Sequence, residues 1–412
     1  MDTLQNMTKK TNAISSATWA TFWTGYCALG MFITLFLENR GLSYTQIGIT
    51  AAAAALVSVF LQLLISDFSD RHNLIPLKRM IAVILVIGIM MSASLMLVPS
   101  SVAFVMIAMV ISTAGMRSIA GLLNGLVMQL KNAGVPLNFG IPRGVGSFAF
   151  AVAAWILGYL IDKTSPEIVL PAHIIFATLA TISVLLMPRP DRVPAGQQYA
   201  TPAVDNENMR SIPAMIRANP TLLFLMLAMI ASFSGQNITF IFLIKIIQNA
   251  GGTPADLGTA LMIQTGAELP AMFLSVWLLK KFGSKKLLTL SFAAFFLKLL
   301  AISLASNIQL VLLAMLIGIF GLGIFIFASV YFVNEIVRES EKIRGQAISG
   351  VIDGISSVLG SLMGGWVIDN WGLPALLGIS TGLCLLGLIL MLLAGRFYKR
   401  DFTSNAIERK QS

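Results

Sequence analysis

The stretch PRPDRVPAGQQYATPAVDNENMRSI, residues 188–212, is the only long polar segment in this chain of 412 residues. It is rich in proline and polar side chains, a composition typical of a linker between folded parts. The chain is strongly apolar on both sides of it, with six hydrophobic stretches before it and six after it. We therefore expect two halves, residues 1–187 and 213–412, joined by a linker at 188–212.

The composition identifies the solvent of these halves. Hydrophobic residues make up 57% of the chain and charged residues 11%, against about 45–50% and about 25% in soluble globular domains. A water-soluble fold could not cover so much apolar surface, and a disordered chain would be polar. Two cysteines, Cys27 and Cys384, exclude a disulfide framework and are too few for a cysteine metal site. We expect a lipid bilayer as solvent and no metal or cofactor.

The apolar stretches have the length of membrane helices. About 20 apolar residues cross a bilayer core as a helix, whereas membrane strands would alternate in segments of about ten residues. We predict an all-α integral membrane protein with two pseudo-symmetric six-helix bundles, in which the first span is an uncleaved helix. The twelve predicted spans are 17–38, 45–68, 76–98, 101–130, 137–161, 167–187, 217–248, 254–280, 284–304, 308–333, 342–369 and 372–397.

The basic residues indicate how the chain crosses the membrane. The net charge is +10, and most of the lysines and arginines lie in the tails and the even-numbered connections. The positive-inside rule therefore places both termini in the cytoplasm, and we expect a bacterial inner (plasma) membrane. Because the charge is spread over many short loops, we expect no nucleic-acid partner.

Short motifs recur in the two halves. The fifth span ends in GYLID, Gly158–Asp162, and the eleventh in GWVID, Gly365–Asp369. Both spans begin near an Arg-Gly pair, and the second-to-third and eighth-to-ninth connections are both short and basic. These matches at equivalent positions indicate an internal duplication.

Ionisable residues inside a span are costly unless paired or hydrated, so each one is a functional hypothesis. Glu268 lies near the middle of its span, where a carboxylate suits a proton carrier but could also form a structural ion pair with Lys298 or an arginine. Arg143 has a planar fork of donors suited to sugar hydroxyls or a carboxylate. Asp353 is a second protonation candidate or a structural partner. The ionisable residues within predicted spans are Arg117, Arg143, Glu268, Lys298 and Asp353.

Polar amides supplement this set. Gln264 lies one turn before Glu268 on the same helix face, and Gln236 and Asn237 lie together in the seventh span. Such amides suit hydroxyl recognition, although they could equally join two helices.

Ser66–Arg79, SDFSDRHNLIPLKR, resembles the motif after the second helix of the major facilitator superfamily. Asp70 and Arg71 match its Asp-Arg pair, while Ser66 replaces its usual glycine. In that family this loop latches the two halves together on the cytoplasmic side. The resemblance implies a cytoplasmic gate at Asp67, Asp70 and Arg71, and the alternative is a charged loop that only sets topology.

Three further stretches resemble the proton-coupled oligosaccharide and nucleoside symporters (the lactose permease-like group). They are Asn138–Phe150, Gly266–Pro270 and Tyr331–Ala347. The first implies a sugar-binding arginine at Arg143 and a stacking aromatic at Phe150, and the second implies a coupling-linked glutamate at Glu268.

The match to that group is incomplete. Asn124 stands where the group has a carboxylate, and the coupling residues of its tenth helix fall on apolar or glycine positions here. Arg117 opens RSIAG, which is similar to a helix 4 motif of proton-coupled facilitators. Lys298 we expect to be structural, because the ninth helix is usually peripheral in this fold.

The resemblance implies a monomeric transporter, not an enzyme, that uses alternating access to couple a proton gradient to symport of a sugar or nucleoside. Its partners are the small-molecule substrate, protons and the bilayer. Proton coupling falls to Glu268, Asp353 and Arg117. The alternatives are an exporter of drugs or metabolites, an organic-anion carrier, and a channel or receptor. The expected substrate-binding residues are Arg143, Phe150, Asn124, Glu268, Asn237 and Gln264.

Overall fold

The computed structural model describes residues 2–71, 75–97, 101–132, 135, 137, 140–188, 212–338 and 341–411. Within these ranges the ordered elements are all helical. Nine helices there are long and apolar enough to cross a membrane, or eleven if each of two bent pairs counts as one span. One of the nine, Arg344–Tyr398, has 55 residues, about 80 Å of helix against a bilayer core of about 30 Å. It is interrupted at Gly372, where φ is 76°, and so provides two crossings. The prediction of an all-helical, twelve-span membrane protein is confirmed.

The chain divides into two compact units. One comprises Met1–Thr201 with Thr253–Met262, and the other Pro202–Gly252 with Ile263–Ser412. Most of the predicted linker, residues 189–211, lies outside the described residues. The start of the eighth span groups with the N-terminal unit, which the sequence did not indicate.

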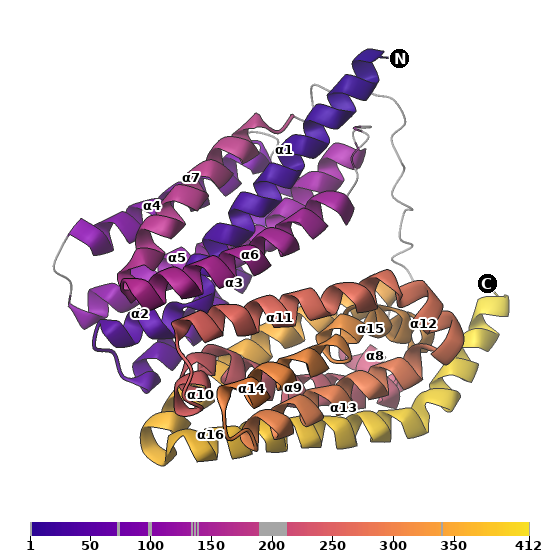
Figure 1. The fold of residues 1–412 in the computed structure, drawn as a ribbon. Coiled ribbons are helices and arrows are strands. Elements are labelled where there is room, and N and C mark those ends of the chain that lie inside the picture. Colours follow the sequence, from indigo (N-terminus) through magenta and orange to yellow (C-terminus); the bar gives the residue numbers. More distant parts are fainter. Residues whose placement is uncertain are drawn as a thin grey trace. The chain divides into compact units, whose positions relative to one another are not determined.

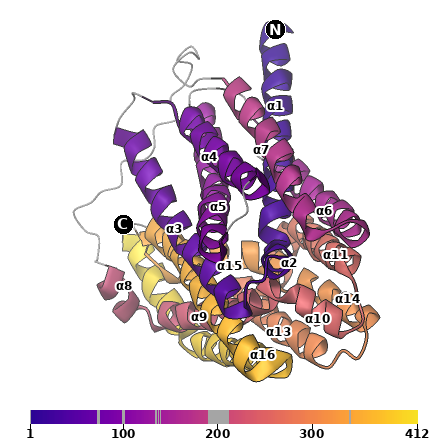
Figure 2. The same ribbon diagram turned by 90° about the vertical axis from the view of Figure 1, so that its left-hand side faces the viewer.

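The N-terminal unit is a bundle of helices (Figure 1). The first helix packs against the sixth and seventh, and the fifth packs against the third and fourth (Figure 2). The polar stretch before residue 17 continues the first helix instead of forming a separate tail. The elements are α1 (Asp2–Tyr26), the π-helix η1 (Cys27–Met31), α2 (Ile33–Asn39), α3 (Tyr44–Arg71), α4 (Leu77–Leu97), α5 (Val102–Asn132), α6 (Gly140–Lys163), the 3-10 turn η2 (Pro166–Ile168) and α7 (Val169–Leu186).

The C-terminal unit is a second bundle, in which the longest helix packs along the ninth and thirteenth helices (Figure 1). Its elements are α8 (Ile212–Ala218), α9 (Pro220–Ile241), α10 (Leu243–Asn249), α11 (Pro254–Phe273) from Ile263 onward, α12 (Ser275–Phe282), α13 (Ser284–Ser303), α14 (Ile308–Leu316), the 3-10 turn η5 (Ile317–Ile319), α15 (Leu322–Ile336) and α16 (Lys342–Gln411).

The two units repeat one irregular feature at equivalent positions. In the N-terminal unit the helix breaks at Phe32, where φ is −102°, and resumes as α2. In the C-terminal unit it breaks at Phe242, where φ is −99°, and resumes as α10. Each seven-residue helix is followed by a glycine at φ 80°, Gly41 or Gly251, a backbone conformation that favours glycine. This shared detail supports an internal duplication, although sequence motifs alone had pointed to other positions.

Lysines at the starts of α4 and α13 each donate to main-chain carbonyls of a neighbouring part of the chain. Lys78, at the start of α4, donates to the main-chain oxygens of Leu185, at 2.9 Å, and Met187. Lys285, at the start of α13, donates to the main-chain oxygen of Gly395 at 2.7 Å. Leu185 lies in the last turn of α7, where an ammonium group satisfies a terminal carbonyl and complements the helix dipole. These basic residues therefore have a packing role in addition to their expected topological role.

An ion pair in the N-terminal unit joins the residue after α2 to the turn before α7, and its arginine also contacts the end of α4. Arg40 Nη2 lies 2.6 Å from Glu167 Oε2, its Nε donates to Glu167 Oε1 at 2.8 Å, and Nη2 also donates to the carbonyl of Leu95 at 3.1 Å. The hydrogen bond from Arg40 to Glu167 raises the pKa of the guanidinium above its ordinary value. The geometry is bidentate, which is the stronger form of this interaction.

We expect Arg40→Ala to lower the free energy of unfolding by about 1–2 kcal/mol, since it leaves Glu167 and the Leu95 carbonyl without this donor. The pair is partly exposed, with side-chain exposures of 24% and 37%, so solvent limits the effect. Thermal unfolding in detergent would measure it, with Arg40→Lys retaining part of the stability. An unchanged unfolding temperature for Arg40→Ala would show that the pair contributes nothing.

Candidate functional site

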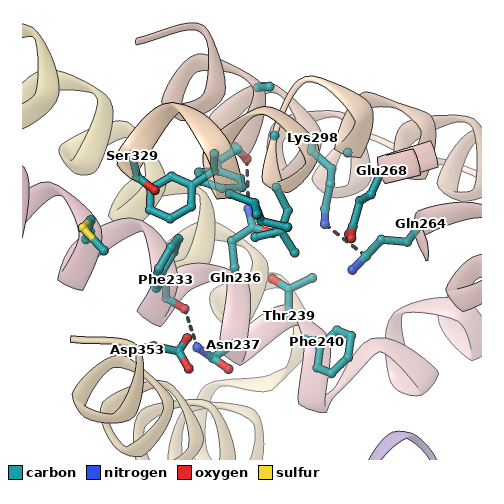
Figure 3. Close-up of a pocket in the computed structure, with 18 of the residues that line it drawn as sticks. Phe233, Gln236, Asn237, Thr239, Phe240, Gln264, Glu268, Lys298, Ser329 and Asp353 are labelled. Atoms are coloured by element: carbon teal, nitrogen blue, oxygen red, sulfur yellow. Dashed lines mark hydrogen bonds between the residues drawn. The ribbon is translucent and has the colours of Figure 1, made fainter. Parts of the chain in front are cut away.

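The C-terminal unit contains a cavity of about 540 Å³, within the range of about 300–1,000 Å³ that is usual for small-molecule sites. Its walls come from α9, α10, α11, α13, α14, η5, α15 and α16. Several of its lining side chains are polar (Figure 3). They are Gln236, Asn237, Thr239, Gln264, Glu268, Lys298, Ser329, Ser349 and Asp353.

A carboxylate, an amide and an ammonium group meet on one wall of this cavity. Gln264 and Glu268 lie four residues apart on α11, so they share one helix face. Lys298 approaches from α13, and its Nζ donates to Gln264 Oε1 at 3.3 Å. Figure 3 shows the Glu268 carboxylate beside the same ammonium group, within electrostatic range of it. The structure therefore brings an acidic and a basic side chain together on this wall.

A glycine permits close helix packing at the position of Glu268. A Cβ atom on Gly323 of α15 would lie 3.2 Å from Glu268 Cα and 3.3 Å from its carbonyl oxygen. A larger residue would crowd α11, because the Cβ atom would also lie 3.1 Å from Ala271 Cβ, and the backbone atoms of Glu268 can yield only if the helix shifts. The lack of a side chain at Gly323 thus lets α15 pack closely against the turn of α11 that carries Glu268.

The two neighbouring amides on α9 have different roles. Gln236 Nε2 donates to the carbonyl of Phe295 at 3.2 Å and lies 3.7 Å from Cys384 Sγ, so it braces α9 against two other helices. Asn237 Nδ2 donates to the carbonyl of Phe233 on its own helix at 2.9 Å, and its side chain lines the cavity near Asp353 (Figure 3). The sequence predicts that these amides either recognise solute hydroxyls or join helices. The contacts of Gln236 fit the joining of helices, while Asn237 lies where a solute could reach it.

Aromatic rings form the apolar part of the cavity wall. Phe233 packs edge-on against Phe325, with ring centroids 4.9 Å apart, and against Phe295 at 5.9 Å. All three line the cavity. Apolar ring faces beside a few placed polar groups are the usual make-up of a small-molecule site.

The remaining charged group of the lining is Asp353, an exposed residue of α16. Together with Glu268 it sets two carboxylates against the single ammonium of Lys298 among the described lining residues. One carboxylate is therefore in excess when all three groups are ionised. This excess favours uptake of a proton or a cationic group and disfavours an anionic ligand.

A second cluster lies in the N-terminal unit, around Arg143. Its guanidinium carbon lies 4.8 Å from the centroid of the Trp23 ring and 5.3 Å from that of Trp19, and Nη1 donates to Ser147 Oγ at 3.0 Å. Phe150 packs edge-on against Trp23 with ring centroids 6.0 Å apart. The predicted pair of Arg143 and Phe150 is thus brought together through Trp23.

Close packing of α6 on α1 makes this cluster possible. A Cβ atom on Gly146 would lie 2.7 Å from Trp23 Cδ1 and 3.2 Å from the carbonyl of Trp19. The indole Nε1 of Trp23 is buried without a hydrogen-bond partner, so it is a donor that a ligand hydroxyl could use. Sequence reasoning missed Trp23, because an aromatic-rich span does not reveal which ring faces Arg143.

The other predicted residues lie on α3 and α5. Asn124 is exposed on α5, Arg117 is half-buried on the same helix, and Asp67 is exposed near the end of α3. The side chains of Asp70 and Arg71 lie outside the described residues, so the latch stays a prediction. Lys298, which we expect to be structural, lines the cavity, and its role stays a prediction.

Comparison with known proteins settles the family. A model of the MFS_1 like family matches residues 17–376, which is most of the chain. The chain belongs to the major facilitator superfamily. It is a multi-pass membrane transporter and not an enzyme, as its sequence had implied.

Relatives of this transporter include a maltose permease from Geobacillus stearothermophilus, 25% identical over 261 residues. That match covers 63% of this chain and 64% of the permease, so it spans less than two thirds of the relative's length.

Solved structures confirm the fold. The nucleoside transporter NupG superposes with a TM-score of 0.74 at 17% identity, covering 96% of this chain and 99% of that one. A mutant of the peptide transporter POT gives a TM-score of 0.71 at 12% identity, covering 94% and 95%.

Proposed function

We propose that this transporter carries a sugar or a nucleoside together with a proton, by alternating access across a bacterial inner membrane with both termini in the cytoplasm. The solute binds in the C-terminal cavity, and Glu268 is the chief proton-carrying group. We also assign a solute-binding role to Arg143 and its aromatic neighbours in the N-terminal unit. No cofactor takes part, because the proton gradient supplies the energy, and the working unit is a monomer.

The observation that carries this proposal is the make-up of the cavity wall. Among the described lining residues, Glu268 and Asp353 are two acidic groups and Lys298 is one basic group, so a proton is the simplest ion to restore balance. Amides at Asn237 and Gln264 and the hydroxyl of Ser329 suit a solute with several hydroxyl groups, and the phenylalanine rings suit an apolar sugar or base face. The partial likeness to a maltose permease supports the same class of solute.

A proteoliposome assay with an imposed pH gradient tests the proposal. Purified protein is given maltose, uridine, organic acids and lipophilic cations in turn, and solute-induced proton flux is recorded. We expect protons to move in the same direction as maltose or uridine. Proton movement opposite to a lipophilic cation would identify an exporter instead, and movement with an organic acid alone would identify an anion carrier.

Arg143→Lys is expected to raise the KM for the transported solute about tenfold. Lysine keeps the charge, but it loses the planar donor fork that lies over Trp19 and Trp23. Initial uptake rates over a range of solute concentrations would measure the change. Lys163→Arg, at the end of the same helix, is the control, and a wild-type KM for Arg143→Lys would remove this residue from the site.

A further inference from the structure

Helix α12, at one end of the C-terminal unit (Figure 1), continues α11 in a different direction. The two helices are bent by 62° at Leu274, and Pro270 lies inside α11 one turn before this break. A proline inside a helix removes a main-chain hydrogen bond and kinks the helix. Because membrane helices tilt by about 20° from the bilayer normal, the bend of 62° sets α12 at about 40° or more to that normal. It therefore turns toward the plane of the membrane.

The length of α11 places this turn at the edge of the hydrocarbon core. α11 has 20 residues, which is about 30 Å of helix and the usual thickness of a bilayer core. α12 thus begins where the core ends and the lipid headgroups start.

Apolar side chains around the bend are uncovered. None of the eight described residues of α12 is buried, and the exposed fraction is 84% for Phe273, 60% for Val276 and 52% for Trp277. Helices that lie in the membrane interface direct apolar side chains into the boundary between headgroups and acyl chains, and tryptophan is enriched at that depth. Lipid is therefore the surrounding that fits these side chains.

Basic side chains follow directly after the apolar ones. Lys280 and Lys281 end α12, and Lys286 lies in the first turn of α13. All three are exposed. Lys281 Nζ lies 4.8 Å from the centroid of the Trp277 ring, so a charge and an interfacial ring share one face. Ammonium groups at this depth attract the phosphates of anionic lipids.

Acidic groups leave this positive charge uncompensated along the chain. The sequence from residue 275 to residue 303 contains no aspartate or glutamate. The helices that pack against α12 are α13 and α15, and the acidic residue of α15 is Glu335. Its carboxylate accepts hydrogen bonds from Ser284 Oγ and, at 2.7 Å, from the hydroxyl of Tyr398. Glu335 is therefore engaged inside the bundle.

We infer that α12 and the first turn of α13 form a binding site for an anionic phospholipid. The rings and apolar side chains hold its acyl chains, and the ammonium groups bind its phosphate. Resting on the topology of the proposed function, with both termini in the cytoplasm, the lipid belongs to the inner leaflet. The residues of this site are Phe273, Val276, Trp277, Lys280, Lys281 and Lys286.

Quenching of tryptophan fluorescence by brominated lipids tests the site in the full-length protein. Brominated phosphatidylglycerol and brominated phosphatidylcholine, with the same acyl chains, are each titrated into liposomes of unlabelled phosphatidylcholine. The contribution of Trp277 is the part of the quenching that Trp277→Phe loses. We expect this part to appear at about fivefold lower content of phosphatidylglycerol than of phosphatidylcholine, the size of one lysine–lipid attraction. High salt should reduce the difference.

Matched variants assign the preference to particular lysines. In Lys280→Gln with Lys281→Gln the two brominated lipids should quench Trp277 equally, whereas Lys280→Arg with Lys281→Arg should keep the preference. Lys9→Gln with Lys10→Gln removes two exposed lysines from α1 and should also keep it. The Gln and Arg variants carry the same two positions, so a folding defect would appear in both.

Three results would overturn the inference. Equal quenching of Trp277 by both lipids in the wild type would show apolar contact without headgroup recognition. An unchanged preference in Lys280→Gln with Lys281→Gln would remove these lysines from the site. An equal loss in the Lys9 and Lys10 control would show a general effect of surface charge. These readings need no solute, so a failure of proton-coupled transport and a failure of lipid binding are separate results.

Discussion

Glu268→Gln is expected to abolish accumulation of solute against its gradient while leaving solute exchange within about threefold of wild type. Glutamine keeps the size and the hydrogen-bonding groups of the side chain, but it cannot take up or release a proton. A carrier whose residue 268 is permanently neutral can still expose its binding site on either side of the membrane, so labelled maltose or uridine should still equilibrate. Uptake into proteoliposomes, with and without a pH gradient, measures both activities in one preparation.

Asp256→Asn provides the matched control for this variant. Asp256 lies on the same helix, where its Oδ2 accepts the main-chain N–H of Thr253 at 2.8 Å, and asparagine can replace it at a helix start. The control should keep gradient-driven accumulation. If Glu268→Gln accumulates solute as wild type does, Glu268 is not the proton carrier and Asp353 becomes the residue to test.

Gly387→Val is expected to prevent the C-terminal bundle from folding. A Cβ atom on Gly387 of α16 would overlap Ser232 Oγ and lie 2.8 Å from the carbonyl oxygen of Ala228 on α9. A serine side chain can rotate, but the Ala228 carbonyl belongs to the helix backbone and cannot move without separating the two helices. Small residues at such contacts let membrane helices approach closely. We expect a loss of about 3 kcal/mol or more.

Gly382→Val on the same helix tests whether the loss comes from the contact of residue 387 with α9 or from the helix propensity of valine. A Cβ atom on Gly382 meets no atom within 4 Å, so valine there should cost little. Monodisperse yield in detergent and the temperature of unfolding would be measured for both variants. Equal losses would contradict the packing argument, because only Gly387 lies against another helix.

Sequence and structure each supply part of the evidence for the internal duplication. The sequence motifs GYLID and GWVID indicated a repeat, and the structure adds the breaks at Phe32 and Phe242 with their following glycines. Those breaks could not be predicted, because phenylalanine and isoleucine around them are ordinary helix residues in a membrane. Only the local φ values identify them.

What the sequence determined was the class of the molecule and the candidates for its chemistry. Apolar runs of bilayer length, basic residues in alternate connections and a central polar segment give a twelve-span membrane protein of two halves, since burial of apolar surface depends on composition and length, and the resemblance of short motifs adds that it is a transporter. Buried charges are costly, so the predicted spans by themselves mark Glu268 and Lys298 as candidates for function. What only the tertiary structure decided was which of them meet. Helices α11 and α13 bring Glu268 and Lys298 to one cavity wall, and Trp23 joins Arg143 to Phe150, because contacts between helices depend on the rotation and depth of each helix, which hydropathy alone does not specify.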